Sequence, residues 1–269
     1  MQYKQLTSEE INRRIRLRKK RRIARRKRRR RFFSLLFLLI LICSILLIRS
    51  CNNKSNSKTE SNTSLKPLLS EDRFTVCIDA GHGEYDNGTY NENLNAFEKD
   101  IALDISLKIG QILEKEDINV IYTRKDDTTP WKSQSDSLKG RCDISNKNNA
   151  DIFVSIHCNY YDDSPNIRGS EVWCRFKDTK DEKLAKFINN NLSMINFTEN
   201  RGLKYESEKK LYVLKNTYAT SVLIELGYLS NTKDTKYLKS LEGKNKCARA
   251  ISEAIIKYKD LINEDEQQL

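Results

Sequence analysis

The chain has 269 residues and a formal net charge of +12, with 49 basic and 37 acidic side chains. The excess lies at one end: residues 1–31 contain 16 Lys or Arg and two Glu, which leaves 33 basic and 35 acidic residues for the rest. Because the remainder is close to neutral, the charge argues against a nucleic-acid-binding fold, and we expect no nucleic-acid partner.

The basic segment runs directly into an uncharged apolar segment, residues 32–48, which Arg49 closes. As a helix these residues rise about 25 Å, at the short end of what spans a hydrocarbon core of about 30 Å. Lys and Arg residues next to a membrane span keep the end of the span that they flank on the cytoplasmic side. The pattern predicts a basic cytoplasmic tail (1–31), a transmembrane signal-anchor (32–48) and an extracytoplasmic remainder. Cleavage as a signal peptide stays an alternative, although Leu47-Ile48-Arg49-Ser50 lacks the small residues of a cleavage site.

Residues 49–72 are rich in Asn, Ser, Lys and Thr without an apolar period, which predicts a flexible linker. From residue 73 to 269, short β-branched runs alternate with longer stretches of helical period. This alternation predicts one α/β domain with a mostly parallel twisted sheet flanked by helices. Strands are expected at 74–79, 119–123, 151–157, 169–175, 211–214 and 221–226. Helices are expected after Glu98 and at about 135–149, 180–195 and 242–262.

Seven cysteines are present, an odd number, and those of the domain are scattered through expected strands and helices. That distribution is unlike a disulfide framework and favours buried, small apolar side chains.

The chain contains two histidines, and each follows an apolar run that ends in small or polar residues: His82 after 76–80 and His157 after 152–156. Ligands in open α/β sheets bind at the carboxyl ends of strands, and neutral imidazole is the commonest side-chain metal ligand. The two placements predict one metal site. A catalytic zinc needs three protein ligands with a fourth position left for water, so a third ligand is required.

Glu98, which opens the long amphipathic helix, is the best candidate for the third ligand. An acid in a first helical turn also interacts favourably with the helix dipole, and Asp100 could serve in that way too. A second acid, Glu225, interrupts the apolar run 221–229. Burial raises the pKa of such a carboxyl, which suits a general base beside a metal. A buried glutamate that bonds a neighbour is an equal alternative.

Six ordered segments resemble the zinc-dependent N-acetylmuramoyl-L-alanine amidases that trim bacterial peptidoglycan. They are 78–83 (IDAGHG), 98–100 (EKD), 123–127 (TRKDD), 150–157 (ADIFVSIH), 200–203 (NRGL) and 223–231 (LIELGYLSN). The resemblance covers residues 74 to 260. It implies that His82, Glu98 and His157 bind one Zn²⁺ per chain and that Glu225 is catalytic.

The resemblance also implies the substrate bond, the amide between the lactyl group of N-acetylmuramic acid and the L-alanine of the stem peptide. The expected partners are peptidoglycan, as substrate, and the membrane, through the anchor. A regulatory protein partner is also possible, and the chain is expected to be a monomer. Glu84 departs from the family pattern, which usually has a glycine there, so the rim near the metal is expected to differ.

Other functions stay open at this point. A cysteine hydrolase using Cys158 beside His157 is geometrically poor, because adjacent strand residues point to opposite faces. A zinc peptidase cutting within the stem would be distinguished by its products. A binding module that has the same fold but no catalytic activity should lack a metal-binding residue or the catalytic acid. All four of these residues are present here. Daughter-cell separation and spore-cortex modification, through muramic-lactam formation, are both compatible with the sequence.

Overall fold

Three strands with almost continuous burial form the centre of the main sheet: β1 (Thr75–Ala80), β5 (Ile152–Asn159) and β8 (Thr220–Tyr228). Their apolar, β-branched side chains suit strands that helices cover on both faces. The computed structural model describes residues 73–267. These residues form one α/β domain.

The main sheet has six strands in the order β4-β1-β5-β8-β6-β7. β1 pairs in parallel with β4 and β5, and β5 pairs in parallel with β8. β6 runs antiparallel to β8 and parallel to β7. The carboxyl ends of β1, β5 and β8 therefore meet at one edge of the sheet. The outer strands are β4 (Asn119–Tyr122), β6 (Ser170–Cys174) and β7 (Asn200–Tyr205).

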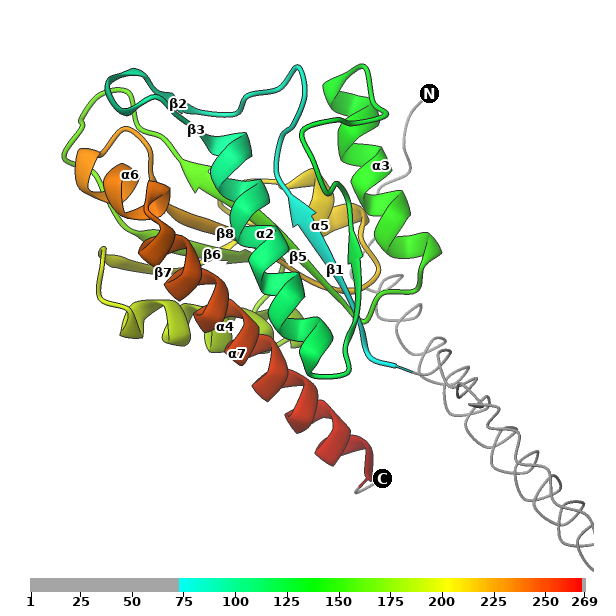
Figure 1. The fold of residues 1–269 in the computed structure, drawn as a ribbon. Helices are drawn as coiled ribbons and strands as arrows, with labels where there is room; N and C mark the ends of the chain where they lie inside the picture. The colour runs from blue at the N-terminus through cyan, green and yellow to red at the C-terminus, as the bar shows by residue number, and fades with distance from the viewer. Residues whose placement is uncertain (1–72, 268–269) are drawn as a thin grey trace, which may run out of the picture. The chain divides into compact units, whose positions relative to one another are not determined.

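Helices cover both faces of this sheet (Figure 1). One face carries α2 (Glu98–Lys115) and α4 (Lys180–Met194), which pack on the sheet, and α7 (Leu241–Gln267), which packs on both of these helices. The other face carries α3 (Gln134–Lys147) and α5 (Tyr212–Asn216). A helix α6 (Thr232–Lys239) follows β8, and a two-stranded hairpin of β2 (Tyr90–Asn91) and β3 (Ala96–Phe97), with η1 (Glu92–Leu94) between them, precedes α2.

Helix α2 shows how the sequence directs one helix face into the core. Ile101, Ile105, Ile109 and Leu113 recur at four-residue steps and are at most 2% exposed. This spacing is that of an amphipathic helix whose apolar stripe faces a sheet. The packing fixes the helix axis, and with it the position of Glu98 at the first residue.

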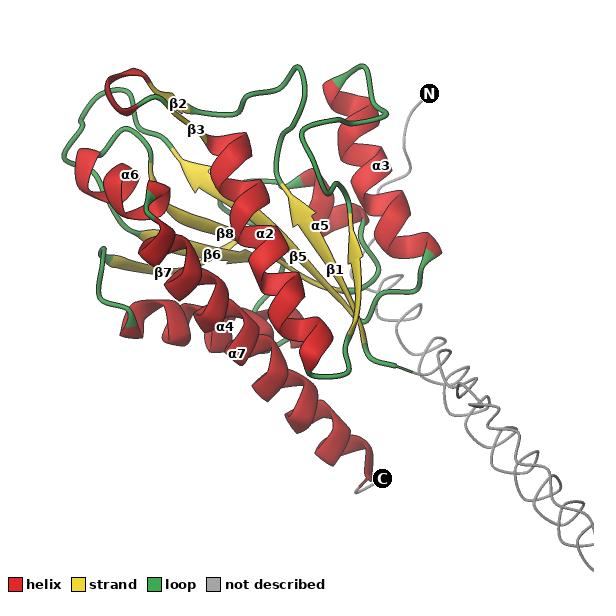
Figure 2. Cartoon of the chain, in the orientation of Figure 1, coloured by secondary structure: helices red, strands yellow, loops and turns green. Residues whose placement is uncertain are grey.

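The predicted α/β class and the mostly parallel sheet are confirmed. The strand predicted at 211–214 is wrong, because these residues lead into the short helix α5 (Figure 2). Periodicity cannot separate a strand from a short helix in so short an apolar run, and Val213 and Leu214 are buried against α3 as helical residues. Strand β7 was not predicted, since it lies at the sheet edge and carries Arg201, Gly202 and Lys204 instead of an apolar run.

The predicted tail, span and linker, residues 1–72, lie outside the described residues, so the domain boundaries drawn there stay predictions. Within 73–267, the structure has no helix that is both long and apolar enough to cross a membrane. The five cysteines in this range are buried and free, as expected of small apolar side chains.

Candidate metal centre and active site

His82 lies in the loop that follows β1, and its φ of +60° falls in the left-handed region that non-glycine residues seldom adopt. Two arginines hold this loop by its carbonyl oxygens. Arg124 donates from Nε to Ala80 O (3.1 Å) and from Nη2 to Gly81 O (2.8 Å). Arg141 donates from Nη2 to His82 O (2.5 Å). Because three successive carbonyls are bound, the backbone that carries His82 is fixed.

Arg141 is itself held by Asp79, a fully buried residue of β1. The Arg141 Nη1 to Asp79 Oδ1 distance is 2.6 Å, and Thr123 Oγ1 and Ser155 Oγ donate to the same carboxylate at 2.7 and 2.6 Å. Burial opposes ionisation, but Arg141 and the two hydroxyls hold the pKa of Asp79 below its usual value. The network joins β1, β5, α3 and the residue that follows β4 beneath the His82 loop.

Glu98 is 2% exposed, and each of its oxygens accepts hydrogen bonds from the surrounding backbone. Thr89 donates to Oε2 from its backbone N (2.8 Å) and from Oγ1 (3.0 Å), while Cys158 N donates to Oε1 (3.0 Å). Burial disfavours the charged form, yet the hydrogen bonds of His157 and His82 lower the pKa of Glu98 well below its usual range. The carboxylate is therefore ionised and fixed in position.

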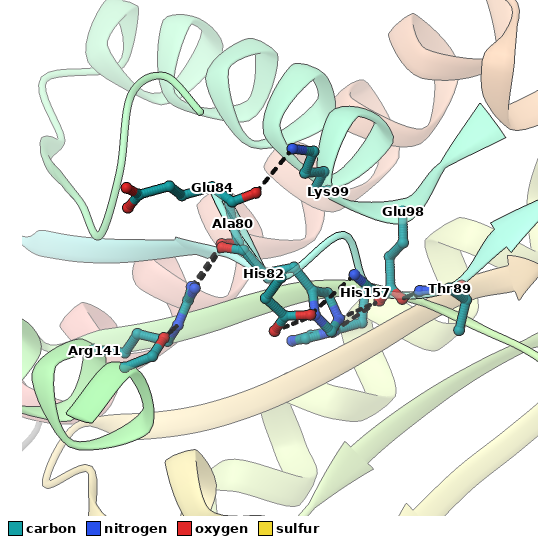
Figure 3. Close-up of polar contacts among 12 residues, drawn as sticks. Ala80, His82, Glu84, Thr89, Glu98, Lys99, Arg141 and His157 are labelled. Atoms are coloured by element: carbon teal, nitrogen blue, oxygen red, sulfur yellow. Dashed lines mark hydrogen bonds and ion pairs between the residues drawn. The ribbon is translucent and has the colours of Figure 1, made fainter. Parts of the chain in front are cut away.

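His82, Glu98 and His157 converge on one point (Figure 3). His82 Nε2 and His157 Nδ1 each lie 3.0 Å from Glu98 Oε1, and the two nitrogens are 3.2 Å apart. Donors bound to zinc at 2.0–2.1 Å in a tetrahedron are about 3.3 Å apart. The triangle thus has the size of one face of such a tetrahedron.

Asp86 orients the imidazole of His82 from behind. His82 Nδ1 lies 2.8 Å from Asp86 Oδ2 and donates this hydrogen bond, so Nε2 points at Glu98 and His157. Burial lowers the pKa of His82, but Asp86 and Glu98 outweigh it and raise the pKa to about 9. The site therefore favours positive charge, and its donor set of two imidazoles and a carboxylate fits a divalent metal such as zinc.

Glu225 stands beside this triangle on β8, in register with His157 of β5. Its Oε2 is inaccessible to solvent and has no hydrogen-bond partner among the described residues. Burial, and then the charge of Glu98, raises the pKa of Glu225 to about 8. A carboxyl in this state can accept or release a proton near neutral pH.

The structure thus brings together the four residues that the sequence singled out. Asp100 is exposed, so it does not replace Glu98. Cys158 is buried in the core on the side of the sheet opposite to His157, and burial raises the pKa of its thiol well above the usual value. This geometry argues against the cysteine hydrolase.

Asp86, Arg124 and Arg141 were not predicted as part of the site. Asp86 follows His82 by four residues, and metal-binding histidines usually donate a hydrogen bond from their second ring nitrogen to a carboxylate or carbonyl, so its spacing was a usable signal.

An α/β domain with a His/Glu/His centre and an unpartnered acid at its sheet edge defines a candidate metal-dependent hydrolase. Residues 76–257 match the family model Amidase_3, described as N-acetylmuramoyl-L-alanine amidase. The chain belongs to this family, which confirms the predicted family and enzyme class.

Known proteins agree with this assignment. An uncharacterized cell wall amidase of Bacillus anthracis is 33% identical over 68% of this chain, and a germination-specific N-acetylmuramoyl-L-alanine amidase of Bacillus subtilis is 28% identical over 68%. The solved CwlD amidase of Clostridioides difficile, in complex with the GerS lipoprotein, is 34% identical with a TM-score of 0.65, over 70% of this chain and 100% of its own. The chain spans 35% of the B. anthracis protein and 78% of the B. subtilis one.

Proposed function

We propose that this chain is a zinc-dependent N-acetylmuramoyl-L-alanine amidase that remodels the cell wall. It hydrolyses the amide between the lactyl group of N-acetylmuramic acid and the L-alanine of the stem peptide in peptidoglycan. The observation that carries the proposal is the triangle of His82, Glu98 and His157 with Glu225 unpartnered beside it, in a chain of the amidase family.

In this mechanism His82, Glu98 and His157 hold the zinc ion. When bound, zinc supplies a Lewis acid that polarises the amide carbonyl and makes water a nucleophile near neutral pH. Glu225 takes the proton of the attacking water and delivers a proton to the departing amide nitrogen. Its raised pKa of about 8 suits both transfers, because the carboxylate is basic enough to accept the proton of water and the carboxyl is still acidic enough to release it near neutral pH.

Asp86, Arg124 and Arg141 position the ligands without touching the substrate. Asp86 fixes the imidazole tautomer of His82, and the two arginines hold the loop that carries it. Thr89 and the backbone of Cys158 hold Glu98. Such preorganised support keeps the donors in place before the metal arrives.

The test is the digestion of a defined muramoyl-peptide by the purified chain, with the products identified by mass. Amidase activity leaves an intact lactyl carboxylate and a stem peptide that begins with free L-alanine. New ends inside the stem would instead assign the enzyme as a peptidase, and intact substrate would reject both activities.

We further propose that the domain acts outside the cytoplasm, held to the membrane by residues 32–48 as an uncleaved anchor. The support is the apolar run with its basic flank and the location of the substrate outside the membrane. A tag at the carboxyl terminus should be digested by protease added to intact spheroplasts. Protection of that tag until lysis would contradict this topology.

Two cellular roles are candidates for this activity: daughter-cell separation and modification of the spore cortex. The similarity to a germination-specific amidase and to CwlD, whose solved complex contains a lipoprotein, favours the spore role and a protein partner. Spores of a strain lacking the gene should then contain no muramic lactam. Normal muramic lactam combined with chained vegetative cells would assign the division role.

A further inference from the structure

Arg201 occupies an irregular position in β7, close to the candidate active site. The pairing of β6 with β7 shifts register between Ser170 and Val172, opposite the part of β7 that contains Arg201 and Gly202. Gly202 has a φ of +77°. Bulges of this kind redirect a side chain and are common beside active sites.

The guanidinium of Arg201 is fixed from one side only. Its Nε donates to Glu171 Oε1 at 2.7 Å, and Tyr228 OH donates to the same oxygen at 3.0 Å. The guanidinium also lies over the Tyr228 ring, 5.4 Å from its centroid. Gly169 leaves room for the aliphatic part of the Arg201 side chain, since a Cβ at residue 169 would lie 2.5 Å from Arg201 Cγ.

The outer edge of the guanidinium, which carries the two Nη atoms, has no hydrogen-bond partner among the described residues. Within residues 73–267, neither Nη atom of Arg201 donates a hydrogen bond, and 34% of its side chain is exposed. The two Nη groups of an arginine form a planar fork that matches a carboxylate. Arg201 is therefore oriented by Glu171 and left free to bind an anion.

The register of the sheet places this fork in line with the catalytic acid. Glu171 of β6 lies opposite Glu225 of β8, and Glu225 is in register with His157 of β5, so these three side chains occupy one face in a row. Arg201, on the next strand, extends that row. Neighbouring strands are about 4.8 Å apart, which puts the backbones of Arg201 and Glu225 about 10 Å apart.

That separation matches a short length of peptide. An extended chain advances about 3.4 Å per residue, so a stem that leaves the scissile amide near Glu225 reaches Arg201 within two or three residues. A second cation, Lys209, is exposed in the loop after β7, and its positive charge lowers the pKa of Glu225. Among the described residues its ammonium makes no ion pair.

We propose that Arg201, oriented by Glu171 and Tyr228 and assisted by Lys209, binds a free carboxylate on the second residue of the stem peptide, the one that follows L-alanine. The inference rests on the proposed amidase function and adds a substrate preference to it. The enzyme selects acidic stems over stems in which that carboxylate is a carboxamide.

The test compares two muramoyl-peptides that differ only in a carboxylate or carboxamide at the residue after L-alanine. For the full chain loaded with zinc, KM should be about 10- to 100-fold lower for the acidic substrate, as expected for charge-assisted hydrogen bonds. Arg201→Gln should raise KM for the acidic substrate by that factor with little change in kcat. The KM for the amidated substrate should stay the same.

Two further variants make the result specific. Lys209→Gln, on an exposed residue, should reduce the preference by a smaller factor. Lys186→Gln removes the same charge on α4, whose helix covers the other sheet face, and should retain the full preference.

Equal KM values for the two substrates in the unaltered chain would overturn the carboxylate site and leave the amidase function standing. A preference that survives in Arg201→Gln would overturn the assignment to Arg201. Cleavage of neither substrate would overturn both proposals.

Discussion

Asp86 lies behind His82, with Oδ2 2.8 Å from His82 Nδ1, and a second hydrogen bond from Gly88 N to Asp86 Oδ1 (3.0 Å) keeps the carboxylate in place. Gly83 and Asp86 are joined by a pair of backbone hydrogen bonds as well, so the turn between them is closed. The imidazole is thereby held with Nε2 toward Glu98.

Replacing Asp86 should weaken metal binding more than it weakens the fold. We expect Asp86→Ala to lower zinc affinity by about 10- to 100-fold, the usual effect of removing such a partner of a histidine ligand. Competition with a chromophoric chelator measures the affinity. Asp104→Ala, which removes an exposed acid on α2 that pairs with Lys244, is the control and should bind zinc normally. Equal affinities for both variants would show that Asp86 does not support the site.

Replacing Glu225 should separate catalysis from metal binding. Glu225→Gln keeps the size of the side chain but cannot accept the proton of water, so we expect kcat to fall by about 10²- to 10⁴-fold. Zinc content, measured by elemental analysis, should stay at that of the unaltered chain, because Glu225 is outside the His82, Glu98 and His157 triangle. Near-normal activity in Glu225→Gln would remove it from the catalytic role.

Replacing Arg141 should affect both stability and the metal. Arg141→Met leaves Asp79 buried without its counter-ion, and breaking such a pair costs about 3–5 kcal/mol. For a domain of this size the loss corresponds to a fall in Tm of about 6–20 °C, measured by circular dichroism. Arg141→Lys keeps the charge but not the planar fork, so it should lose less stability while still weakening zinc binding through His82. An unchanged Tm for Arg141→Met would contradict the role of the pair.

Asp181, in the first turn of α4, should make the stability depend on pH. Burial raises its pKa from 3.8 to about 6, although Ser221 N donates to it at 3.1 Å and Arg175 favours its charge. Between these two values the folded state holds the proton more firmly than the unfolded state, so stability falls as pH rises from about 4 to about 6 and stays lower above. A shift of this size is worth at most about 3 kcal/mol.

The matching variant is Asp181→Asn, which keeps an acceptor for Ser221 N and removes the charge. It should gain stability relative to the unaltered chain at pH 7.5 and show little gain at pH 4, both measured by urea denaturation. Asp104→Asn, on an exposed acid, should show no such gain. A stability of Asp181→Asn that is lower at pH 7.5 would contradict the raised pKa.

The central fold, and the coming together of the four candidate site residues, could be predicted because each leaves a local signal. Strands β1, β5 and β8 appear as continuous apolar runs, and both histidines and Glu225 interrupt or follow such runs. Glu98 appears as the residue that opens a strongly periodic helix. Once parallel strands were assumed, their carboxyl ends had to meet at one edge.

The supporting network could not be predicted, because it depends on long-range contacts between polar side chains. Arg141 meets Asp79 across 62 residues of sequence, and nothing in the polar, Ser-rich sequence of α3 marks that arginine as buried. Arg124 lay inside a recognised segment, but its binding of two loop carbonyls requires the folded loop. Edge strand β7 lacks an apolar run, and the redirected Arg201 depends on a bulge that only pairing creates.

The most direct test of the central claim removes the metal and returns it. The full chain, stripped with a chelator and dialysed, should release no stem peptides from purified peptidoglycan, and activity should return in proportion to added Zn²⁺ and saturate at one ion per chain. His82→Ala should not recover at the same zinc concentration. If the stripped chain released stem peptides that begin with L-alanine, and added zinc did not change the rate, the proposed zinc-dependent mechanism would be wrong.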